Sequence, residues 1–141
     1  MPETVREVMT PDPSTVRTDD SALDAALAMS KGDFGAIVVT AGESDEVRGI
    51  VTDRDIVVRA VAAGKDPAAT RISEVFTTEP TTLSPDDDLD DAVKALRESH
   101  VRRLPVVEDS HVVGIVSIGD LAQARDERSA LADISSAAPN N

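Results

Sequence analysis

The chain has 141 residues, of which 14 are Lys or Arg and 27 are Asp or Glu, so its formal net charge is -13. It contains no Cys, which excludes disulfides, thiolate catalysis, cysteine zinc sites and iron–sulfur clusters. It also lacks Trp and Tyr, and its excess negative charge repels phosphate backbones, so we expect no nucleic-acid binding. The apolar fraction of 40% is enough for a folded core. No apolar run has the length of a membrane span or a signal peptide, so we expect a cytoplasmic protein with no membrane partner.

The sequence contains an internal duplication. When residue 5 is laid over residue 72, Val5–Thr10 (VREVMT) matches Ile72–Thr77 (ISEVFT). The register changes by two residues in one turn, after which Gly49–Thr52 (GIVT) matches Gly114–Ser117 (GIVS). Because register and polarity are both kept over this span, the sequence predicts two structural repeats.

Each repeat is predicted to contain a helix after an acidic segment with a hydroxyl residue. Carboxylates and hydroxyls in Asp19–Ser21 and Ser84–Asp88 suit a helix N-terminus, because they cap free amides and complement the helix dipole. Apolar residues then recur at i, i+3, i+4 and i+7 and define one helical face. These residues are Ala22, Ala25, Ala26 and Met29 in the first repeat and Leu89, Ala92, Val93 and Leu96 in the second.

A hairpin and a second helix follow in each repeat. A short apolar run predicts a buried strand, a polar turn follows, and a second strand completes the hairpin. The strands are expected at 36–39 and 47–52 in the first repeat and at 104–107 and 112–117 in the second. The second helix is expected to begin near Asp53–Asp55 in the first repeat and near Gly119–Asp120 in the second.

We therefore divide the chain into repeat 1 at 4–61, a linker at 62–71, repeat 2 at 72–125, and a C-terminal helix with a frayed tail at 126–141. One β-α-β-β-α repeat of this size buries too little surface to be stable alone. We expect an α+β (α/β-like) fold in which the two repeats pack sheet to sheet with pseudo-twofold symmetry and leave clefts beside the axis.

A short motif occurs at the same place in both repeats. It consists of Gly, two aliphatic residues, a hydroxyl residue, two variable positions and Asp, and its copies are Gly49–Asp55 (GIVTDRD) and Gly114–Asp120 (GIVSIGD). A strand thus ends in a hydroxyl residue directly before a helix N-terminus that carries a carboxylate. Free amides at such a turn suit a phosphate, and the two oxygens of a carboxylate suit the paired hydroxyls of a ribose.

With the duplication, the order of elements and the motif together, the chain resembles a tandem pair of CBS domains, a Bateman module, over about residues 4–125. Thr52–Val57 and the linker are also similar to stand-alone bacterial CBS-pair proteins of the hypoxic-response type. This resemblance implies an adenosine-containing ligand (AMP, ADP, ATP or S-adenosylmethionine) in the clefts between the repeats. It further implies that Asp55 and Asp120 hold ribose hydroxyls and that Thr52 and Ser117 contact ribose or phosphate.

The resemblance also places the residues before the first hairpin strand at the ligand. They are Phe34, Gly35 and Ala36 in repeat 1 and Val101, Arg102 and Arg103 in repeat 2. Arginine supplies a guanidinium group for phosphate, whereas glycine and alanine do not, so we expect asymmetric occupancy. The cleft with Ser117, Asp120, Arg102, Arg103 and the Phe34 region should favour a phosphorylated ligand. The cleft with Thr52 and Asp55 should hold a nucleoside-like group or stay empty.

Structural alternatives exist for all of these residues. Asp55 and Asp120 are of a type that caps helices, and Thr52 and Ser117 are of a type that satisfies local backbone groups. The two arginines have Glu98 and Glu108 as candidate ion-pair partners. The acidic run at 86–91 is interpreted as a helix N-terminus in water rather than as a metal site.

We find no nucleophile–base pair and no metal-ligand set, so we expect a protein that is not an enzyme and needs no cofactor. The leading hypothesis is a sensor module that acts in trans on an unidentified target protein. The alternative is a ligand-free interaction protein or stress-associated structural dimer. CBS pairs commonly associate through helical faces, and the apolar segment Ile56–Val61 favours a homodimer.

Overall fold

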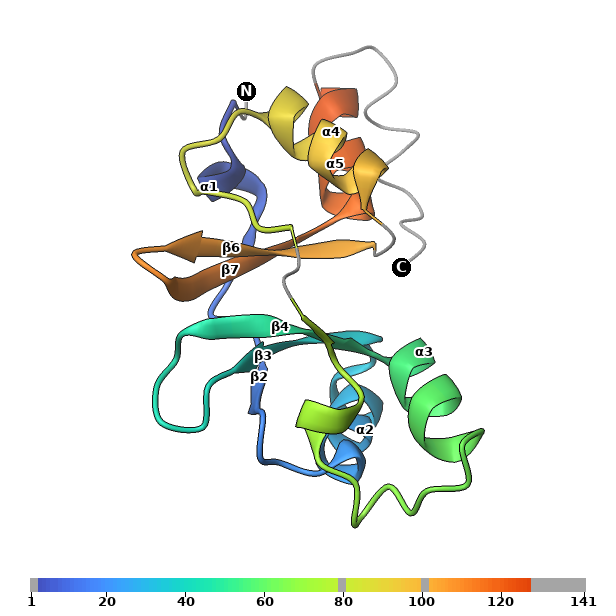
Figure 1. Cartoon of the computed structure of the whole chain (residues 1–141). Helices are drawn as coiled ribbons and strands as arrows, with labels where there is room; N and C mark the ends of the chain where they lie inside the picture. The colour runs from blue at the N-terminus through green and yellow to red at the C-terminus, as the bar shows by residue number, and fades with distance from the viewer. Residues whose placement is uncertain (1–2, 79–80, 100–101, 128–141) are drawn as a thin grey trace. The chain divides into compact units, whose positions relative to one another are not determined.

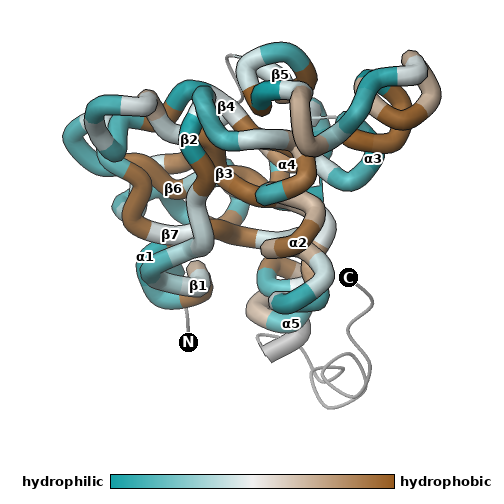
Figure 2. Tube along the Cα trace, turned by 90° about the horizontal axis from the view of Figure 1, so that it is seen from below, coloured by the Kyte–Doolittle hydropathy of each residue, from teal (hydrophilic) through white to brown (hydrophobic). Residues whose placement is uncertain are grey.

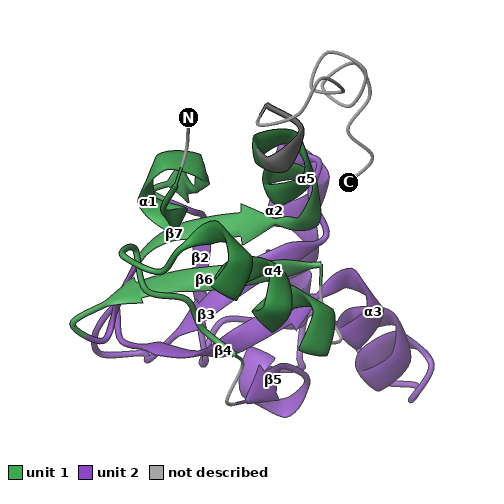
Figure 3. Ribbon diagram, turned by 90° about the horizontal axis from the view of Figure 1, so that it is seen from above, with its two compact units in different colours: residues 1–12, 81–109, 113–141 green, residues 13–80, 110–112 purple. Residues whose placement is uncertain are grey.

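A computed structural model describes residues 3–78, 81–99 and 102–127 (Figure 1). These residues form a mixture of helices and strands, which confirms the predicted α+β class. They fall into two compact units, coloured separately in Figure 3. Unit 1 draws its described residues from the segments 1–12, 81–109 and 113–141, and unit 2 draws them from 13–80 and 110–112.

Unit 2 holds, among the residues described, a four-stranded sheet in the order β2-β3-β4-β5. Strand β2 pairs parallel with β3, and β4 pairs antiparallel with both β3 and β5. The elements of unit 2 are β2 (Thr15–Arg17), α2 (Ala22–Gly32), β3 (Ala36–Thr40), β4 (Val47–Thr52), α3 (Asp53–Ile56), the π-helix η1 (Val57–Val61), the 3-10 helix η2 (Ile72–Glu74) and β5 (Thr77–Thr78).

Helix α2 begins and packs as its sequence predicts. Ser21 and Asp24 form a reciprocal capping box, in which the Asp24 N–H donates to Ser21 Oγ at 3.0 Å and the Ser21 N–H donates to Asp24 Oδ2 at 3.1 Å. Three of the four predicted face residues, Ala22, Ala25 and Met29, are buried in the core of unit 2 with side chains of β3 and β4.

The segment between the repeats closes the N-terminus of α2. The Ala22 and Leu23 N–H groups donate to the carbonyls of Thr70 and Pro67 at 2.8 and 3.1 Å. These bonds satisfy amides that have no partner inside the helix. The preceding helix η1 ends at Val61, and Gly64 in the turn that follows has a φ of +77°, the left-handed conformation that favours glycine.

Unit 1 contains, in its described part, a three-stranded sheet in the order β1-β7-β6, and helices α4 and α5 contact each other beside it (Figure 1). Its core combines side chains from both helices with Leu104, Val106 and Val116 of the hairpin and with Val5 near the N-terminus. The elements are α1 (Val5–Val8), β1 (Thr10–Pro11), α4 (Leu89–Glu98), β6 (Arg103–Glu108), β7 (His111–Ser117) and α5 (Ile118–Glu127).

The compact units cut across the sequence repeats, because the opening segment of each repeat packs in the other unit (Figure 3). Helix α1 and strand β1 open repeat 1 but belong to unit 1, where Thr10 is paired with Ile115 of β7. Likewise, η2 and β5 open repeat 2 but belong to unit 2, where Thr77 is paired with Ile50 of β4. The two exchanges are equivalent under the duplication.

The glycine that opens each motif lies where the backbone of an exchanged segment pairs closely with the strand. A Cβ atom on Gly49 would overlap the Thr77 carbonyl oxygen and the ring of Phe76. A Cβ atom on Gly114 would lie 2.5 Å from Met9 Sδ and 3.0 Å from the Thr10 carbonyl oxygen. The glycine of the motif therefore permits close approach of another backbone.

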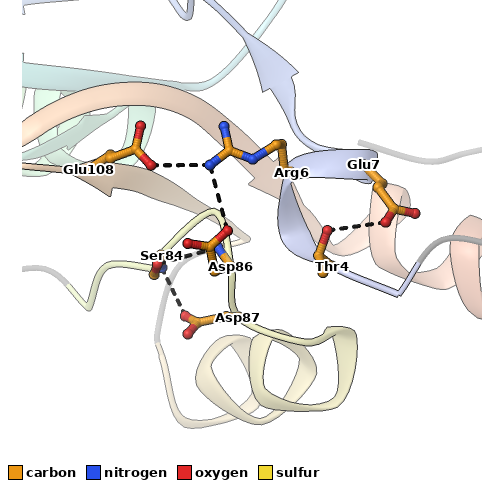
Figure 4. A network of polar contacts seen from close by, with 7 residues as sticks. All are labelled: Thr4, Arg6, Glu7, Ser84, Asp86, Asp87 and Glu108. Atoms are coloured by element: carbon orange, nitrogen blue, oxygen red, sulfur yellow. Dashed lines mark hydrogen bonds and ion pairs between the residues drawn. The ribbon is translucent and has the colours of Figure 1, made fainter.

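A polar network attaches α1 to the rest of unit 1 (Figure 4). The Arg6 guanidinium lies 3.1 Å from Glu108 Oε2 and 3.6 Å from Asp86 Oδ1. Backbone bonds support it, since the N–H groups of Val5 and Arg6 donate to the carbonyls of Asp87 and Pro85 at 2.9 and 3.0 Å. Glu108, which is a candidate ion-pair partner of Arg102 or Arg103 in the sequence analysis, is thus bonded to Arg6.

The acidic run before α4 is a helix N-terminus, as predicted. Asp88 is the N-cap and accepts a hydrogen bond from the Asp91 N–H at 2.8 Å. Asp87 accepts from the Ser84 N–H at 2.8 Å and closes the preceding turn (Figure 4). These carboxylates satisfy backbone amides and lie at the positive end of the helix dipole.

Candidate functional site

The two motif turns have the same local geometry. In repeat 1, the Asp55 N–H donates to Thr52 Oγ1 at 3.1 Å and the Thr52 N–H donates to Asp55 Oδ2 at 2.9 Å. In repeat 2, the Asp120 N–H donates to Ser117 Oγ at 3.1 Å and the Ser117 N–H donates to Asp120 Oδ2 at 2.9 Å. All four residues therefore cap the helix that follows, and all four are half-buried.

One further backbone bond joins each motif turn to the residue before the first hairpin strand. The Asp53 N–H donates to the Gly35 carbonyl at 2.9 Å, and the Ile118 N–H donates to the Arg102 carbonyl at 2.9 Å. Each unit thus brings its predicted residues together at one corner of its sheet. We call Gly35, Thr52, Asp53 and Asp55 the repeat-1 half-site, and Arg102, Arg103, Ser117, Ile118 and Asp120 the repeat-2 half-site.

The repeat-1 half-site carries carboxylates at its corner. A Cβ atom on Gly35 would lie 2.9 Å from Asp53 Oδ2, so the Asp53 carboxylate lies directly against the glycine. Asp53 Oδ1 accepts a hydrogen bond from the Arg54 N–H at 2.8 Å. The Asp55 side chain is only 12% exposed, and its Oδ1 lies 4.0 Å from Arg59 Nε.

The repeat-2 half-site has a different chemical character at the same corner. Arg102 is exposed and Arg103, the first residue of β6, is half-buried. Ile118 is 49% exposed, although it is a large apolar residue. This half-site therefore joins two guanidinium groups, an exposed apolar side chain, a hydroxyl and one carboxylate.

The remaining predicted site residues are placed as follows. Phe34 is half-buried against the core of unit 2, and its N–H donates to the Met29 carbonyl at 3.2 Å. Ala36 opens β3. Val101 lies outside the described residues. Phe34 belongs to unit 2 and the repeat-2 half-site to unit 1, so their meeting in one cleft stays a prediction.

Sequence reasoning missed Asp53, Ile118 and Arg59 as parts of these half-sites. Asp53 and Ile118 occupy the first variable position of the motif, and the motif alone assigns no role to that position. A signal was present, because this position changes from a carboxylate to an apolar residue between the repeats. Arg59 is separated from the motif in sequence and is brought back to Asp55 by one helical turn.

No group of three or more His, Asp or Glu side chains within 3–78, 81–99 and 102–127 is placed to hold a metal ion. In this same part of the chain, no helix has the length and apolar character needed to cross a membrane.

Comparison with protein-family models matches the CBS domain at residues 5–61 and again at residues 72–127. The chain belongs to the CBS-domain family. The resemblance inferred from the duplicated motif is therefore confirmed, and both sequence repeats are CBS domains.

Known CBS-domain proteins resemble the chain over most of its length. The CBS domain-containing protein YhcV of Bacillus subtilis is 39% identical over 118 residues, which cover 84% of this chain and 82% of YhcV. Hypoxic response protein 1 of Mycobacterium tuberculosis is 31% identical over 120 residues, which cover 85% of this chain and 83% of that protein. The predicted similarity to the hypoxic-response type is confirmed.

Solved structures of CBS-pair proteins have the same fold. A structure of hypoxic response protein I with two coordinated zinc ions matches with a TM-score of 0.79 at 30% identity, covering 85% of this chain and 97% of that chain. A structure of CBSX2 in complex with AMP matches with a TM-score of 0.75 at 25% identity, covering 89% of this chain and 97% of that chain.

Proposed function

We propose that this CBS-domain protein is a regulatory module that binds an adenosine-containing ligand and acts in trans on a partner protein. The candidate ligands are AMP, ADP, ATP and S-adenosylmethionine. One observation carries the proposal: the Arg102 backbone is bonded to the turn that holds Ser117 and Asp120. The residues that we assign to phosphate and to ribose thus belong to one corner of unit 1. The AMP complex of the similar protein CBSX2 supports the same ligand class.

The proposed roles follow from the donors and acceptors at the repeat-2 half-site. Asp120 uses Oδ2 for the Ser117 N–H, so Oδ1 is the oxygen assigned to a ribose hydroxyl. The guanidinium groups of Arg102 and Arg103 are assigned to phosphate, which they can bind through two N–H donors at once. This half-site has arginine at Arg102 and Arg103, where repeat 1 has Gly35 and Ala36, so we assign the phosphorylated ligand to it.

We also propose that the protein acts by binding rather than by catalysis and forms a homodimer. Helix α3 continues into η1, and Ile56 and Ala60 of this segment are buried in the core of unit 2. Its other face and the neighbouring α2 leave large apolar side chains in contact with water, and Figure 2 shows the hydrophobic character of the α3 region. The exposed side chains are Leu23, Leu27, Val57, Val58 and Val61. Burial of these side chains against a second copy would remove them from water.

A second candidate function, a ligand-free interaction dimer, is favoured by the capping bonds. Thr52, Asp55, Ser117 and Asp120 all have backbone partners without any ligand. The duplicated motif is then explained by helix capping alone. An experiment must therefore separate the capping role of these aspartates from a binding role.

The pair of variants Asp120→Ala and Asp55→Ala makes that separation, because both lose a capping bond of 2.9 Å in the same geometry. We expect each to lower the free energy of unfolding by about 1 kcal/mol, the usual loss for a helix cap. Only Asp120→Ala should abolish AMP binding, as measured by isothermal titration calorimetry at a temperature where both variants are folded. Full AMP binding by Asp120→Ala would contradict the assignment of Asp120 to the ribose, whereas wild-type protein that binds none of the candidate ligands would favour the interaction dimer.

A further inference from the structure

We propose that Asp53 is a specificity-determining residue that excludes phosphate from the repeat-1 half-site, so that each chain binds phosphorylated ligand only at the repeat-2 half-site. The inference rests on the proposed function. Asp53 is not among the binding residues predicted from the sequence. Its carboxylate repels phosphate, whereas the absence of arginine at Gly35 and Ala36 only fails to attract it.

Asp53 and Ile118 are equivalent in structure as well as in sequence. Both follow the hydroxyl residue of the motif, and each donates its N–H to the residue before the first hairpin strand, at 2.9 Å in both repeats. The acceptors, Gly35 and Arg102, are themselves matched by the duplication. The pair Gly35–Asp53 therefore occupies the same backbone corner as the pair Arg102–Ile118.

The two pairs carry opposite charge, since Asp53 is a carboxylate and Arg102 is a guanidinium. In repeat 2 the corner has a guanidinium and an uncharged aliphatic side chain. In repeat 1 it has no side chain at Gly35 and a carboxylate at Asp53, with Oδ2 only 2.9 Å from the position of a Cβ atom on that glycine. The carboxylate thus lies where the arginine side chain begins in the other repeat. A phosphate at this corner would meet a like charge in place of an opposite one.

Other charged groups lie at or beside the repeat-1 half-site. Asp55 adds a second carboxylate, which is largely buried. Arg59 lies 4.0 Å from Asp55, and its Nη1 donates to the carbonyls of Val75 and Phe76 at 3.3 Å. Arg54 is exposed and directly follows Asp53, so it serves as a matched control for a single change of charge at this turn.

Substitution at Ile118 tests the inference in the half-site that is expected to bind. Ile118→Asp introduces the repeat-1 carboxylate beside Arg102, and Ile118→Asn is the uncharged control. Because Ile118 is 49% exposed, both variants should fold. We expect Ile118→Asp to weaken AMP binding about tenfold more than it weakens adenosine binding, a difference in free energy of about 1.4 kcal/mol. Unchanged AMP affinity, or equal weakening of AMP and adenosine binding, would overturn the inference.

The reciprocal substitution transfers the repeat-2 corner to repeat 1. Wild-type protein should bind one AMP per chain in isothermal titration calorimetry. The double variant Gly35→Arg with Asp53→Ile should bind two, and Arg54→Gln should still bind one. A double variant that melts like wild-type protein and still binds one AMP would overturn the role of Asp53.

The wild-type titration separates failure of the inference from failure of the proposed function. Wild-type protein that binds two AMP molecules per chain with equal affinity would overturn the inference and leave the proposed function standing. Wild-type protein that binds none of AMP, ADP, ATP, S-adenosylmethionine and adenosine would overturn the proposed function, and the inference with it.

Discussion

Gly49 and Gly114 are needed because the backbone of a paired segment lies close against the strand at these residues. This requirement is separate from any role of the motif in binding. At Gly49 the obstacle to a side chain is the Thr77 carbonyl oxygen, a backbone atom held in a strand pair. Neither the strand nor its neighbour can move away without breaking hydrogen bonds of the sheet.

Gly49→Ala should therefore lower the free energy of unfolding by about 1–3 kcal/mol, as overpacking in a rigid site does. Gly42→Ala is the control, because its Cβ atom would meet only the Asp19 side chain, at 3.2 Å, which is free to rotate. Urea unfolding followed by circular dichroism measures both variants. Equal stability of the two variants would show that the pairing of β5 with β4 does not require glycine at residue 49.

At the residue scale, the sequence predicts the polar segment before α2, the buried helix faces and the acidic N-terminus of α4, because each depends on neighbours in sequence. It leaves Asp55 and Asp120 open between capping and binding. The structure shows the capping bonds of both, and the binding role stays a prediction. The part of Asp53 was missed because its position is variable in the motif, and only its contact with Gly35 gives it a place in the half-site.

At the scale of elements, the exchange of opening segments is the main feature that sequence similarity does not predict. Similarity identifies which segments are related, but it does not specify which core a segment joins. The strands and helices of each repeat were predictable from apolar periodicity, whereas the pairing of β1 with β7 and of β5 with β4 depends on contacts distant in sequence.

Arg59 attaches the segment that leads into repeat 2 to the helix of repeat 1. Its Nη1 donates to the carbonyls of Val75 and Phe76, and both distances are 3.3 Å. Helix η1 presents Arg59 toward this segment one turn after Asp55.

Arg59→Met should lower the free energy of unfolding by about 1 kcal/mol, because it removes hydrogen bonds to backbone carbonyls while keeping much of the side-chain bulk. Hydrogen exchange should increase in the segment 72–78 more than elsewhere in the chain. Arg54→Met is the control, since its side chain is exposed and should change neither quantity. Unaltered exchange of 72–78 in Arg59→Met would show that this arginine does not hold the segment.

At the scale of the whole molecule, the exposed apolar side chains of α2 and of the α3–η1 segment determine the proposed assembly. Leu27, Val57 and Val61 are each more than half exposed, at 58%, 56% and 57%. Their substitution should not disturb the core, because Ile56 and Ala60 on the other face of the segment make the core contacts.

The double variant Leu27→Asp with Val57→Asp should convert the proposed homodimer to a monomer, because it places charges on a surface that association would bury. Sedimentation equilibrium gives the mass of wild-type protein and of the variant. The exposed pair Lys31→Asp with Arg54→Asp is the control for added negative charge. A wild-type mass equal to that of one chain, or a dimer that survives the Leu27 and Val57 changes, would contradict this surface as the interface.

Binding of an adenosine-containing ligand by this CBS pair is tested by thermal melting of wild-type protein with AMP, ADP, ATP, S-adenosylmethionine and adenosine, and with GMP as the guanosine control. A ligand at 100 times its dissociation constant stabilises the folded state by about 2.7 kcal/mol. For a protein of this size, that stabilisation should raise the melting temperature by several degrees. We predict such an increase with AMP, a smaller one with adenosine and none with GMP. An unchanged melting temperature with all of these adenosine compounds at millimolar concentration would contradict ligand sensing and would favour the interaction dimer.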